Sequence, residues 1–572
     1  MFKWNLKIFK QLIKIAKPYW FSNTASRGKR LLLVLIILSI ASSTILVFET
    51  MQRGEIISSL AVRDGDRFWQ TLKLICLIIV ISVPLISFKT YVESRLALDW
   101  RRWLTDKYLS EYLSEQRFFN LNAYSEIDNH DRTIAEDIDE FSQQSLFLFV
   151  QCLDASIQLI AFVGIIWLIY QPMVWFLLVY SVVGTGILFL LFSRKLTVIN
   201  FAQYRQEADF RFGLIRVRDN TESIAFYCGE ALEKSQVAGK FKKAIANFNH
   251  LIKWQFGLDL FQNGFQFLTM IIPAIILAPS IISGSIEVGA VTQSQIAFER
   301  IWLSLSLVIL QFEKITALAA GIKRIAELDE RLESLPKRSV TEGNLISLEA
   351  SDRLSLKQLS VDTPDLDSQI IKSLSVEVVP QNNILIVGES GVGKTSLVRA
   401  IAGLWQSGTG VISKPTSENI LFLPQRPYLI LGTLEQQLIY PYLSRQYTHH
   451  KLVEIIKKVN LNEVLNKFGG LDAKQEWWRV LSRGEQQRLA FARLLLHQPK
   501  YAVLDESTSA LDGHNQDLLY QELALTSITY ISVGHRANLL QYHQQVLQLK
   551  SDRSWEIFLA EEFSFNGKIE ES

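Results

Sequence analysis

The chain has 572 residues, of which 49% are hydrophobic and 20% are charged, and its mean hydropathy is +0.16. These values exclude a single ordinary soluble domain and indicate a membrane-embedded part joined to a water-soluble part. The net charge of +2 gives no indication of a nucleic-acid partner. The three cysteines, Cys76, Cys152 and Cys228, are too few and too widely spaced to indicate a disulfide framework or a metal site.

The first segment, Met1–Trp20, has lysines on one side and includes the apolar residues Trp4, Phe9, Ile13 and Trp20. This pattern favours an amphipathic helix in the membrane interface, and an ordinary solvated helix is the alternative. Because no A-x-A-like site follows the first apolar run, we do not expect a cleaved signal peptide.

Six long apolar runs follow, and each is about as long as the ~20 residues that a helix needs to cross a bilayer. The predicted crossings are approximately 31–50, 72–93, 145–170, 173–193, 257–283 and 289–312. We therefore predict an all-α transmembrane domain with six crossings over residues 1–335, and the alternative is a set of buried core helices.

Lysine and arginine are concentrated before the first run and in the two long connections, 93–141 and 193–254. The connections on the other side, 49–71, 171–172 and 284–288, are short and lack a comparable positive excess. The positive-inside rule therefore predicts that both termini are cytoplasmic. The spacing of apolar and charged residues in the long connections predicts helices that extend below the membrane.

The composition changes near residue 336, where we predict a linker over residues 336–349. From 350 to 562, short apolar strands alternate with helices, which predicts an α/β domain with a largely parallel sheet. The clearest strands are Asn383–Val387, Ala502–Leu504 and Ile528–Val533, and residues 563–572 form a tail.

A phosphate-binding loop follows the first of these strands. It matches G-x-x-x-x-G-K-[ST] with Gly388, Glu389, Ser390, Gly391, Val392, Gly393, Lys394 and Thr395, and Ser396 follows. In such a loop the glycines allow backbone N–H groups to converge on phosphate oxygens. Lys394 neutralises β/γ-phosphate charge, and Thr395 ligates Mg²⁺. A helix beginning near Thr395 would add positive potential at its N-terminus.

Two carboxylates, Asp505 and Glu506, end the strand Ala502–Leu504. Two buried carboxylates are costly unless they have a chemical role. We expect Asp505 to hold Mg²⁺ through water and Glu506 to polarise the attacking water. Taken alone, this pair would favour an ordinary strand end, but it lies downstream of the phosphate loop.

The segment Leu481-Ser482-Arg483-Gly484-Glu485 opens a helical run and resembles the ABC signature sequence, LSGGQ. With it, residues 350–560 resemble ABC ATPases. Three further family motifs match in order: the Q-loop glutamine, the D-loop and the switch histidine. They are Gln425, Ser509-Ala510-Leu511-Asp512 and His535.

This resemblance implies an ATPase that uses ATP and Mg²⁺, with Glu506, His535 and Gln425 in catalysis and Thr395, Gln425 and Asp505 at the metal. It also implies that two such domains sandwich two ATP molecules. Ser482 and Gly484 of one chain, with Asp512 nearby, would then meet the phosphate held by Lys394 of another. A chain with one copy of each motif is thus expected to be a half-transporter that forms a homodimer.

Three positions depart from the family pattern. Arg483 replaces a signature glycine and Glu485 replaces the glutamine, whereas Ser482 and Gly484 are intact, so we expect activity to survive. The third departure is the segment Val361-Asp362-Thr363-Pro364, where many ABC ATPases have an aromatic residue that stacks on adenine. The sequence therefore leaves the recognition of adenine open.

Segments of both halves resemble the SbmA/BacA-like bacterial transporters and the related peroxisomal fatty-acyl (subfamily D) transporters. The segments are 17–20, 129–137, 222–230, 363–364 and 424–428. The resemblance implies an exporter-type six-helix fold, whose members carry peptides, cobalamin and other hydrophilic compounds, or long-chain acyl groups. Some of them import. It also implies a multi-pass protein of the bacterial inner membrane, although a peroxisomal relative would look similar.

Two segments of the cytoplasmic connections are candidates for coupling the ATPase to the membrane helices, and stable solvated turns are the alternative. The coupling candidates are Asn129, Asp131, Glu136, Glu222 and Glu230. Polar residues inside crossings tend to face a cavity or a neighbouring helix. Gln262, Gln266 and Glu299 therefore predict a polar translocation cavity, with helix–helix contact as the alternative.

The leading interpretation is an ATP-hydrolysing transporter that works by alternating access and carries a hydrophilic cargo, such as a cobalamin-like compound or a peptide, with import as one direction. A long-chain acyl transporter is the alternative cargo class. An ATP-gated regulator or channel is the alternative mechanism, against which the intact Glu506, Gln425 and His535 argue. Six crossings argue against a soluble ATPase acting on nucleic acid.

Overall fold

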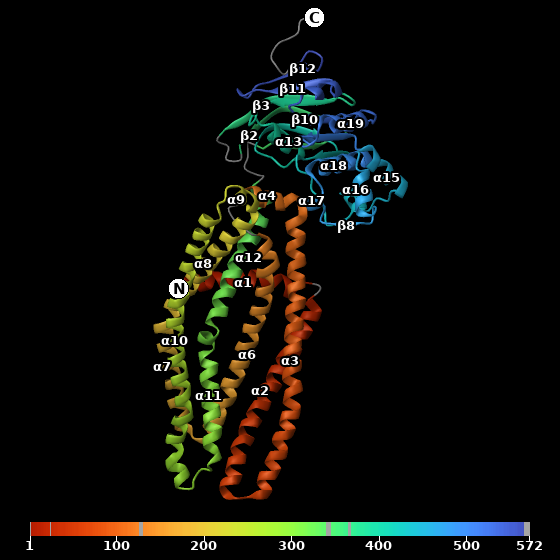
Figure 1. Ribbon diagram of the computed structural model, residues 1–572. Coiled ribbons are helices and arrows are strands. Elements are labelled where there is room, and N and C mark those ends of the chain that lie inside the picture. Colours follow the sequence, from red (N-terminus) through yellow and green to blue (C-terminus); the bar gives the residue numbers. More distant parts are fainter. Residues whose placement is uncertain (1, 23–24, 125–129, 339–344, 364–367, 565–572) are drawn as a thin grey trace. The chain divides into compact units, whose positions relative to one another are not determined.

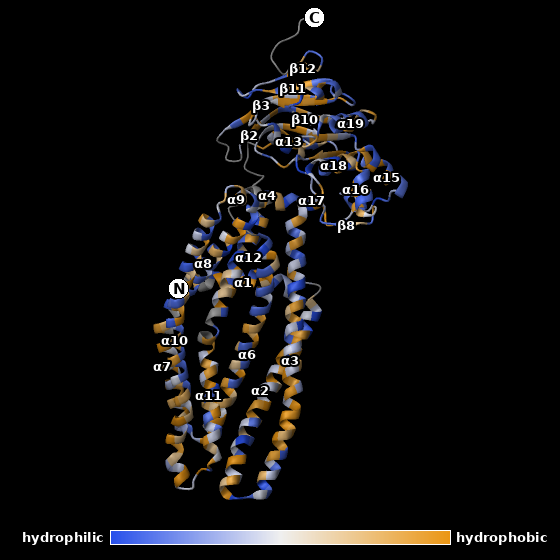
Figure 2. Ribbon diagram, in the orientation of Figure 1, coloured by the Kyte–Doolittle hydropathy of each residue, from blue (hydrophilic) through white to orange (hydrophobic). Residues whose placement is uncertain are grey.

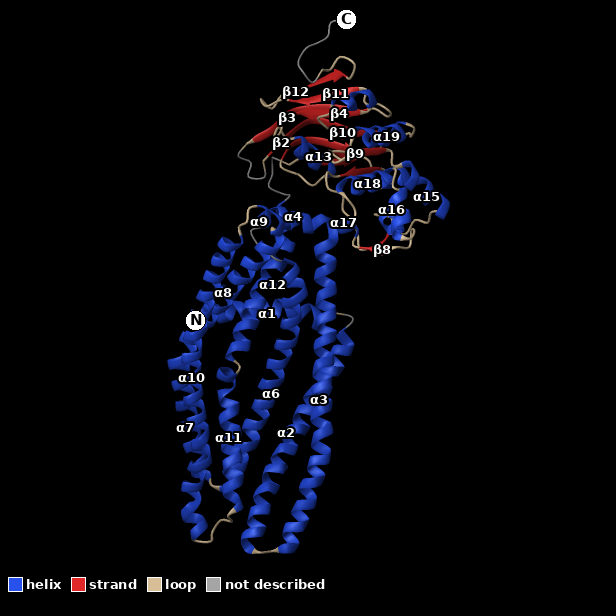
Figure 3. Ribbon diagram, viewed as in Figure 1, coloured by secondary structure: helices blue, strands red, loops and turns tan. Residues whose placement is uncertain are grey.

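The computed structural model describes residues 2–22, 25–124, 130–338, 345–363 and 368–564 (Figure 1). The chain forms two compact units, one of residues 1–114 and 126–332 and one of residues 115–125 and 333–572. The first unit is built from helices, and the described strands lie in the second (Figure 3). This agrees with the prediction of an all-α membrane domain followed by an α/β domain.

The described helical part begins with α1 and two long helices, which are followed by nine further α-helices and three short turns. In chain order these are α1 (Phe2–Phe21), α2 (Ala25–Val62), α3 (Gly65–Leu113), η1 (Ser114–Gln116), α4 (Arg117–Tyr124), α5 (His130–Arg132), the π-helical turn η2 (Thr133–Asp137), α6 (Ile138–Ile169), α7 (Gln171–Leu188), the π-helical turn η3 (Phe189–Ser193), α8 (Arg194–Asp219), α9 (Thr221–Phe226), α10 (Glu230–Ile282), α11 (Gly289–Leu310) and α12 (Phe312–Arg338). The predicted linker, 336–349, overlaps the end of α12.

Five helical runs of the described chain are long and apolar enough to cross a membrane, and Figure 2 shows the hydrophobic residues along them. They lie in α2, α3, α5–α6, α7–η3 and α10. The sixth predicted crossing is α11, which Gln293, Gln295, Glu299 and Arg300 make more polar than the other five. Because α11 packs against α2, α6, α7 and α10, and its Phe298 is fully buried, it belongs to the same bundle. Its crossing stays a prediction.

Two helices are much longer than the apolar runs inside them. Helix α3 has 49 residues and α10 has 53, so at 1.5 Å per residue they are roughly 70–80 Å long. The predicted cytoplasmic helices of the long connections are therefore continuations of membrane helices. Helices α8 and α10 run side by side over much of this extension (Figure 1).

Helix α12 is attached to the rest of its unit by buried charges. Asp137 of η2, whose side chain is 1% exposed, accepts two hydrogen bonds of 2.7 Å from Arg324. Asp329 pairs with Lys14 of α1 at 2.9 Å and accepts a hydrogen bond of 3.2 Å from Tyr108 of α3. These contacts fix α12 against α1, α3 and η2.

The second unit contains two main sheets. One has the order β1-β5-β2-β3, with β1 (Ser347–Ala350), β2 (Leu354–Asp362), β3 (Gln369–Val378) and β5 (Gly408–Lys414). The other has the order β12-β11-β4-β10-β9-β6, with β4 (Ile384–Gly388), β6 (Ile420–Leu423), β9 (Tyr501–Asp505), β10 (Thr529–Val533), β11 (Gln545–Leu549) and β12 (Trp555–Leu559). The predicted strands correspond to β4, β9 and β10.

Helices surround the six-stranded sheet, and a small two-stranded antiparallel sheet, β7 (Gly432–Thr433) with β8 (Lys474–Gln475), lies beside them. The helices are α13 (Lys394–Ala402), α14 (Leu434–Ile439), α15 (His449–Lys458), α16 (Asn462–Phe468), α17 (Trp477–Val480), α18 (Arg483–His497), α19 (Gly513–Ala524) and η4 (Ala537–Tyr542). Trp477 and Phe491 are fully buried in the core that α14–α19 share with the sheet.

Strand order brings the predicted motifs together. Strands β4, β10, β9 and β6 are parallel neighbours, so their carboxyl ends lie at one edge of the sheet. The phosphate loop follows β4, Glu506 follows β9, His535 follows β10 and Gln425 follows β6. Residues separated by more than a hundred positions therefore meet at this edge.

Candidate functional site

The phosphate loop has the backbone that its glycines predict. Gly388, Gly391 and Gly393 have φ angles of 152°, 85° and 103°, a region that other residues rarely adopt. A Cβ atom at Gly393 would lie 2.2 Å from Cγ2 of Ile370, so a larger residue does not fit there. Helix α13 begins at Lys394, and its N-terminal amides offer donors to an anion.

The Lys394 side chain is 6% exposed and donates hydrogen bonds to the carbonyl oxygens of Gly388 at 2.8 Å and Glu389 at 2.7 Å. Burial lowers the pKa of Lys394, and the nearby carboxylates of Glu506 and Asp505 oppose that shift. The ammonium group is thus held inside the loop by carbonyl groups. Phosphate oxygens are the stronger acceptors for such a group.

Glu506 lies at the centre of the site and contacts residues that follow two neighbouring strands. Its φ angle of 45° is left-handed, and its backbone N–H donates to the carbonyl oxygen of Val533 at 3.2 Å. Its carboxylate accepts a hydrogen bond of 2.8 Å from Nε2 of Gln425 and lies 3.5 Å from Nε2 of His535. Strain at a residue that other loops hold in place is typical of functional sites.

Asp505 lies beside Glu506, at the end of β9. Burial raises the pKa of Asp505, and the neighbouring Glu506 raises it further, whereas Arg399 and Lys394 lower it. Two adjacent carboxyl groups at a half-buried strand end indicate a site that receives positive charge.

The signature segment is a helix N-terminus. Ser482 is the N-cap of α18, and its Oγ accepts a hydrogen bond from the backbone N–H of Glu485 at 3.3 Å. The Glu485 carboxylate in turn accepts from the backbone N–H of Ser482 at 2.7 Å and from its hydroxyl at 2.8 Å. This reciprocal capping box gives Glu485 the role that a glutamine would also fill. Gly484 is half-buried, and the first helical residue, Arg483, is exposed.

Gln487 connects the signature helix, the Q-loop and the D-loop, and no motif in the sequence predicts these contacts. Its side chain is 3% exposed, and its Nε2 donates to the carbonyl oxygen of Gln425 at 3.1 Å and to Oγ of Ser509 at 3.3 Å. Its Oε1 accepts from the backbone N–H of Ala510 at 3.0 Å. One buried amide therefore joins the signature helix, the Q-loop and the D-loop.

The D-loop is held from its other side by Arg536, which follows the switch histidine. Its Nη1 donates to the carbonyl oxygen of Leu511 at 2.9 Å and to Oε1 of Gln516 at 2.8 Å. Asp512 caps α19 by accepting from the backbone N–H and the side chain of Asn515. These hydrogen bonds lower the pKa of Asp512. Within one chain, Asp512 thus has a structural partner.

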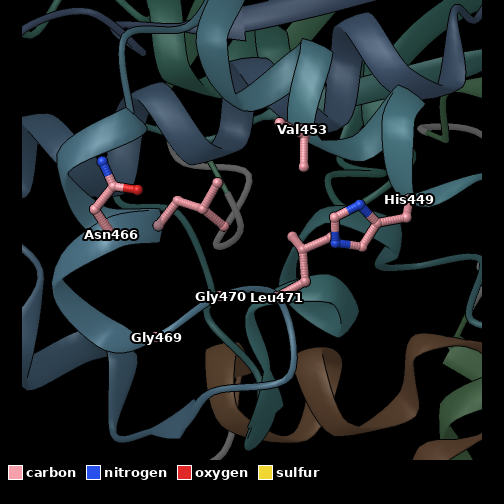
Figure 4. Close-up of a pocket in the computed structure, with 7 residues that line it drawn as sticks. His449, Val453, Asn466, Gly469, Gly470 and Leu471 are labelled. Carbon is pink, nitrogen blue, oxygen red and sulfur yellow. The ribbon is translucent and has the colours of Figure 1, made fainter.

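Several pockets lie in this unit. A cleft of about 660 Å³ is lined by Gln425, Pro427, Trp478, Ser482, Gln487 and Ser509, among others. A smaller pocket of about 330 Å³ lies at α15 and α16, where His449 and Asn466 are on opposite sides (Figure 4). Of these two, the larger cleft contains residues that the sequence predicted for the site, including Gln425 and Ser482.

The structure does not test the predicted lack of an adenine-stacking aromatic residue at 361–364, because residues 364–367 lie outside the described chain. The described part of the segment ends in Thr363, and the carbonyl oxygen of Asp362 accepts a hydrogen bond of 2.8 Å from the indole of Trp405. The sequence from 313 to 404 contains no aromatic residue.

Of the coupling candidates, Asn129 lies outside the described residues. Asp131 in α5, Glu222 in α9 and Glu230 at the start of α10 are exposed, and Glu136 pairs with Arg132 at 2.9 Å. The buried charge of the first segment is Asp137, which the sequence analysis did not select because its partner, Arg324, is 187 residues away.

Two of the three cavity candidates contact each other. Nε2 of Gln266 in α10 donates to Oε1 of Glu299 in α11 at 3.0 Å, and Gln262 is half-buried one turn away. This bond supplies the helix–helix contact that was the alternative to a cavity. A second polar pair, Lys89 of α3 with Asp154 of α6, joins neighbouring helices at 2.5 Å.

Comparison with known proteins adds family information. Residues 15–282 match the family model "ABC transporter transmembrane region 2", and residues 371–509 match the model "ABC transporter". An uncharacterised ABC transporter ATP-binding protein of Synechocystis sp. is 42% identical over 504 residues, covering 86% of this chain and 76% of that protein. The chloroplastic ABC transporter D family member 2 of Arabidopsis thaliana is 37% identical over 622 residues, covering 96% and 88%.

A more distant relative and a solved structure extend over nearly the whole chain. The human lysosomal cobalamin transporter ABCD4 is 28% identical over 590 residues, covering 96% of each protein. A bacterial Atm1-family ABC exporter with ATP bound is 18% identical and superposes with a TM-score of 0.73 over 94% of this chain and 96% of that one. This likeness shows the exporter fold.

Proposed function

This chain belongs to the ABC transporter family and is homologous to its subfamily D members, and we propose that it is a half-transporter that works as a homodimer. Its ATPase domain couples ATP hydrolysis to transport across a membrane. The observation that supports the assignment of the site is the meeting of Gln425, Glu506 and His535 at the sheet edge that also holds Lys394.

In the proposed reaction, Glu506 accepts a proton from the water that attacks the γ-phosphate, and Gln425 and His535 orient its carboxylate. Lys394, the loop residues Gly388–Gly393 and the N-terminal amides of α13, including those of Thr395 and Ser396, bind the phosphates. The hydrogen bond from Gln425 to Glu506 uses the amide nitrogen, which leaves the amide oxygen for another partner.

The oxygen atoms of Thr395, Gln425 and Asp505 fit Mg²⁺, a hard cation that prefers oxygen ligands. The pKa of Asp505 is raised because burial and Glu506 disfavour its negative charge. A bound cation would stabilise that charge. When bound, Mg²⁺ would neutralise phosphate charge.

We propose a homodimer because the signature segment of one chain suits the phosphate site of another. Ser482 and Gly484 stand at an exposed helix N-terminus, which suits a phosphate held by Lys394 of a second copy. Asp512 would lie at the same interface.

The proposed cargo is hydrophilic, either a cobalamin-like compound or a peptide, with import as the proposed direction. The support is the similarity to the human lysosomal cobalamin transporter ABCD4 and the polar side chains of Gln262, Gln266 and Glu299 among the membrane helices. We also propose that the chain is related to the SbmA/BacA-like branch that its sequence motifs resemble, which supports the same cargo class. We place the protein in a bacterial inner membrane with the ATPase domain in the cytoplasm.

For coupling, we propose that the turn around Glu222 and Glu230 contacts an ATPase domain and transmits its closure. Its tip carries Phe226 and Tyr227, which are both strongly exposed and so are available to fill a cleft. The segment with Asn129, Asp131 and Glu136 is proposed to act in the same way.

The test is ATP hydrolysis by the purified protein in lipid nanodiscs, with cobalamin, short cationic peptides or long-chain acyl compounds, and with Glu506→Gln as the blank. We expect hydrolysis by the wild type and stimulation by one of the first two classes. Stimulation by acyl compounds alone would contradict the cargo proposal. Wild-type activity equal to the blank in every condition would contradict the transporter and favour a regulator.

A further inference from the structure

The N-terminal segment has an extreme charge distribution. Eight basic residues and no acidic residue precede Glu49. Five of the eight lie in α1, and three follow at the start of α2, immediately before the apolar run at Leu31. A positive cluster of this kind must be balanced by acidic groups of the fold or by anions outside it.

One face of α1 packs on the helical bundle. Ile15 and Tyr19 are buried, and the ring of Tyr19 stacks on Trp100 of α3 at 5.8 Å, with Trp103 at the same distance edge-on. Lys14 pairs with Asp329 of α12. Helix α1 is therefore held in a fixed position, and the rest of its surface is presented outward.

The outward surface combines lysines with large apolar side chains. Lys7, Lys10, Lys14 and Lys17 follow each other at intervals of three and four residues and so form one stripe. Next to that stripe, the side chains of Phe9 and Ile13 are 58% and 45% exposed. Phe21, at the end of α1, is 76% exposed.

Most of this positive charge has no acidic partner in the described part of the chain. Of the lysine stripe, only Lys14 forms an ion pair there with an acidic residue. Lys17 and Lys29 lie 6.0 and 5.8 Å from the ring centre of Phe21, which places two ammonium groups around one exposed aromatic ring. The fold therefore supplies fixed positions but leaves this charge unbalanced.

We propose that the face formed by Lys7, Lys10, Lys17, Lys29, Phe9 and Phe21 is a docking surface for anionic phospholipid headgroups. The lysines bind phosphate oxygens, and the exposed Phe9, Ile13 and Phe21 enter the acyl boundary. Amphipathic helices with lysine on the polar face and large apolar side chains on the other lie in the bilayer interface in this way. Each lysine near an anionic bilayer surface contributes about fivefold to binding.

Two observations favour a lipid over a protein as the occupant. The surface adjoins the start of α2, a helix that is long and apolar enough to cross a membrane, so a bilayer surface lies next to it. The exposed apolar side chains of Phe9 and Ile13 border a stripe of lysines, whereas the core of a protein interface is depleted of lysine.

The docking surface also has a connection to the transport cycle, and this extension rests on the proposed function. Lys14 and Tyr108 both contact Asp329 of α12, the helix that precedes the ATPase domain. Lipid bound along α1 would fix Lys14, and with it the position of α12. We therefore expect anionic lipid to raise ATP hydrolysis.

The test uses the full-length protein and two matched triple variants. Lys7→Gln, Lys10→Gln and Lys17→Gln remove three charges from the docking surface, while Lys14 stays to hold α1 in place. Lys234→Gln, Lys242→Gln and Lys243→Gln remove three exposed charges from α10. A third variant with arginine at positions 7, 10 and 17 keeps the charge.

Native mass spectrometry after supply of equal amounts of phosphatidylglycerol and phosphatidylcholine measures which lipid is retained. We expect a severalfold preference for phosphatidylglycerol in the wild type, the α10 variant and the arginine variant, and loss of most of it in the first triple variant. Equal retention by the first triple variant and the wild type, or equal loss in both glutamine variants, would overturn the proposal.

The catalytic blank Glu506→Gln separates this proposal from the proposed function. It should keep the lipid preference of the wild type without hydrolysing ATP. If the wild type prefers phosphatidylglycerol but does not hydrolyse ATP, the docking surface is supported and the proposed transporter is contradicted. If the wild type hydrolyses ATP without any lipid preference, the transporter is supported and the docking surface is contradicted.

Discussion

The amide nitrogen of Gln425 lies 2.8 Å from Oε2 of Glu506, although 81 residues separate the two positions in the sequence. The two residues follow β6 and β9, which are parallel neighbours in the six-stranded sheet. The hydrogen bond therefore connects the loop after β6 with Glu506, the proposed general base, which follows β9. His535 approaches the other carboxylate oxygen at 3.5 Å.

The first prediction concerns Glu506→Gln. The amide keeps the size of the side chain but cannot accept a proton, so we expect kcat for ATP hydrolysis to fall by about 10²–10⁴-fold, the usual contribution of a general base. Binding of a fluorescent ATP analogue should be retained, because Lys394 and the phosphate loop are untouched. Phosphate release measures the first quantity. Hydrolysis within twofold of the wild type would contradict the role of Glu506.

The second prediction concerns Gln487→Ala. The change leaves the backbone N–H of Ala510 without its side-chain acceptor and frees the Q-loop carbonyl at Gln425. An unsatisfied buried group costs about 1–3 kcal/mol, so kcat should fall roughly 10- to 100-fold with a smaller change in KM.

The matched control for that prediction is Gln486→Ala, one position earlier on the same helix. Gln486 donates to the carbonyl oxygens of Trp478 and Leu481, whereas Gln487 donates to the Q-loop and D-loop. We expect its kcat to stay near the wild-type value. Equal losses in both variants would indicate general damage to α18.

The third prediction concerns the unusual signature residue Glu485. Glu485→Gln preserves the capping box with Ser482, so stability and activity should stay close to the wild type. Glu485→Ala removes the acceptor for two hydrogen bonds at the start of α18, and we expect a loss of about 1 kcal/mol in the free energy of unfolding. Thermal unfolding measures this loss. A glutamine variant as unstable as the alanine variant would be inconsistent with the cap.

The fourth prediction is a pH dependence from His543, which is buried among Tyr520 and Tyr530 and hydrogen-bonded to Ser532. Burial lowers the pKa of His543 to about 4 from an ordinary value of 6.5. As the pH falls below 6.5 the unfolded chain takes up this proton first, so stability is lost as the pH falls from 6.5 to 4. At pH 5 the loss is about 2 kcal/mol.

Thermal unfolding of the full chain at pH 7 and pH 5 measures that loss, with His543→Asn as the comparison. The asparagine variant should be less stable than the wild type at pH 7, and its melting temperature should fall less between the two pH values. Equal falls in both proteins would exclude His543 as the source.

Local patterns predicted much of this structure. The phosphate loop, the strand before it and the helical run that opens at the signature segment each depend on residues a few positions apart, which a linear motif contains. Other contacts join segments that are distant in the sequence, so local spacing does not predict them. They are the contacts of Gln487, the pair of Asp137 with Arg324 and the pair of Lys14 with Asp329.

Hydropathy predicted where the apolar runs lie but not where the helices end. Nothing in α3 or α10 terminates the helix at the membrane surface, so both continue well beyond the predicted limits near 93 and 257. The polar residues Gln266 and Glu299 predict either a cavity or a helix–helix contact, and their mutual hydrogen bond depends on the packing of α10 and α11, which the sequence does not contain.

The central claim is that one chain completes the ATP site of another. Cysteines introduced by Ser390→Cys in the phosphate loop and Ser482→Cys in the signature, in a Glu506→Gln background with Cys76, Cys152 and Cys228 changed to serine, test it directly. A disulfide requires Cα atoms within about 7 Å. The account predicts a covalent dimer on a non-reducing gel that forms with ATP and is absent without nucleotide or with either new cysteine alone. A monomer in every condition, or the same amount of cross-linked dimer with and without ATP, would contradict the claim.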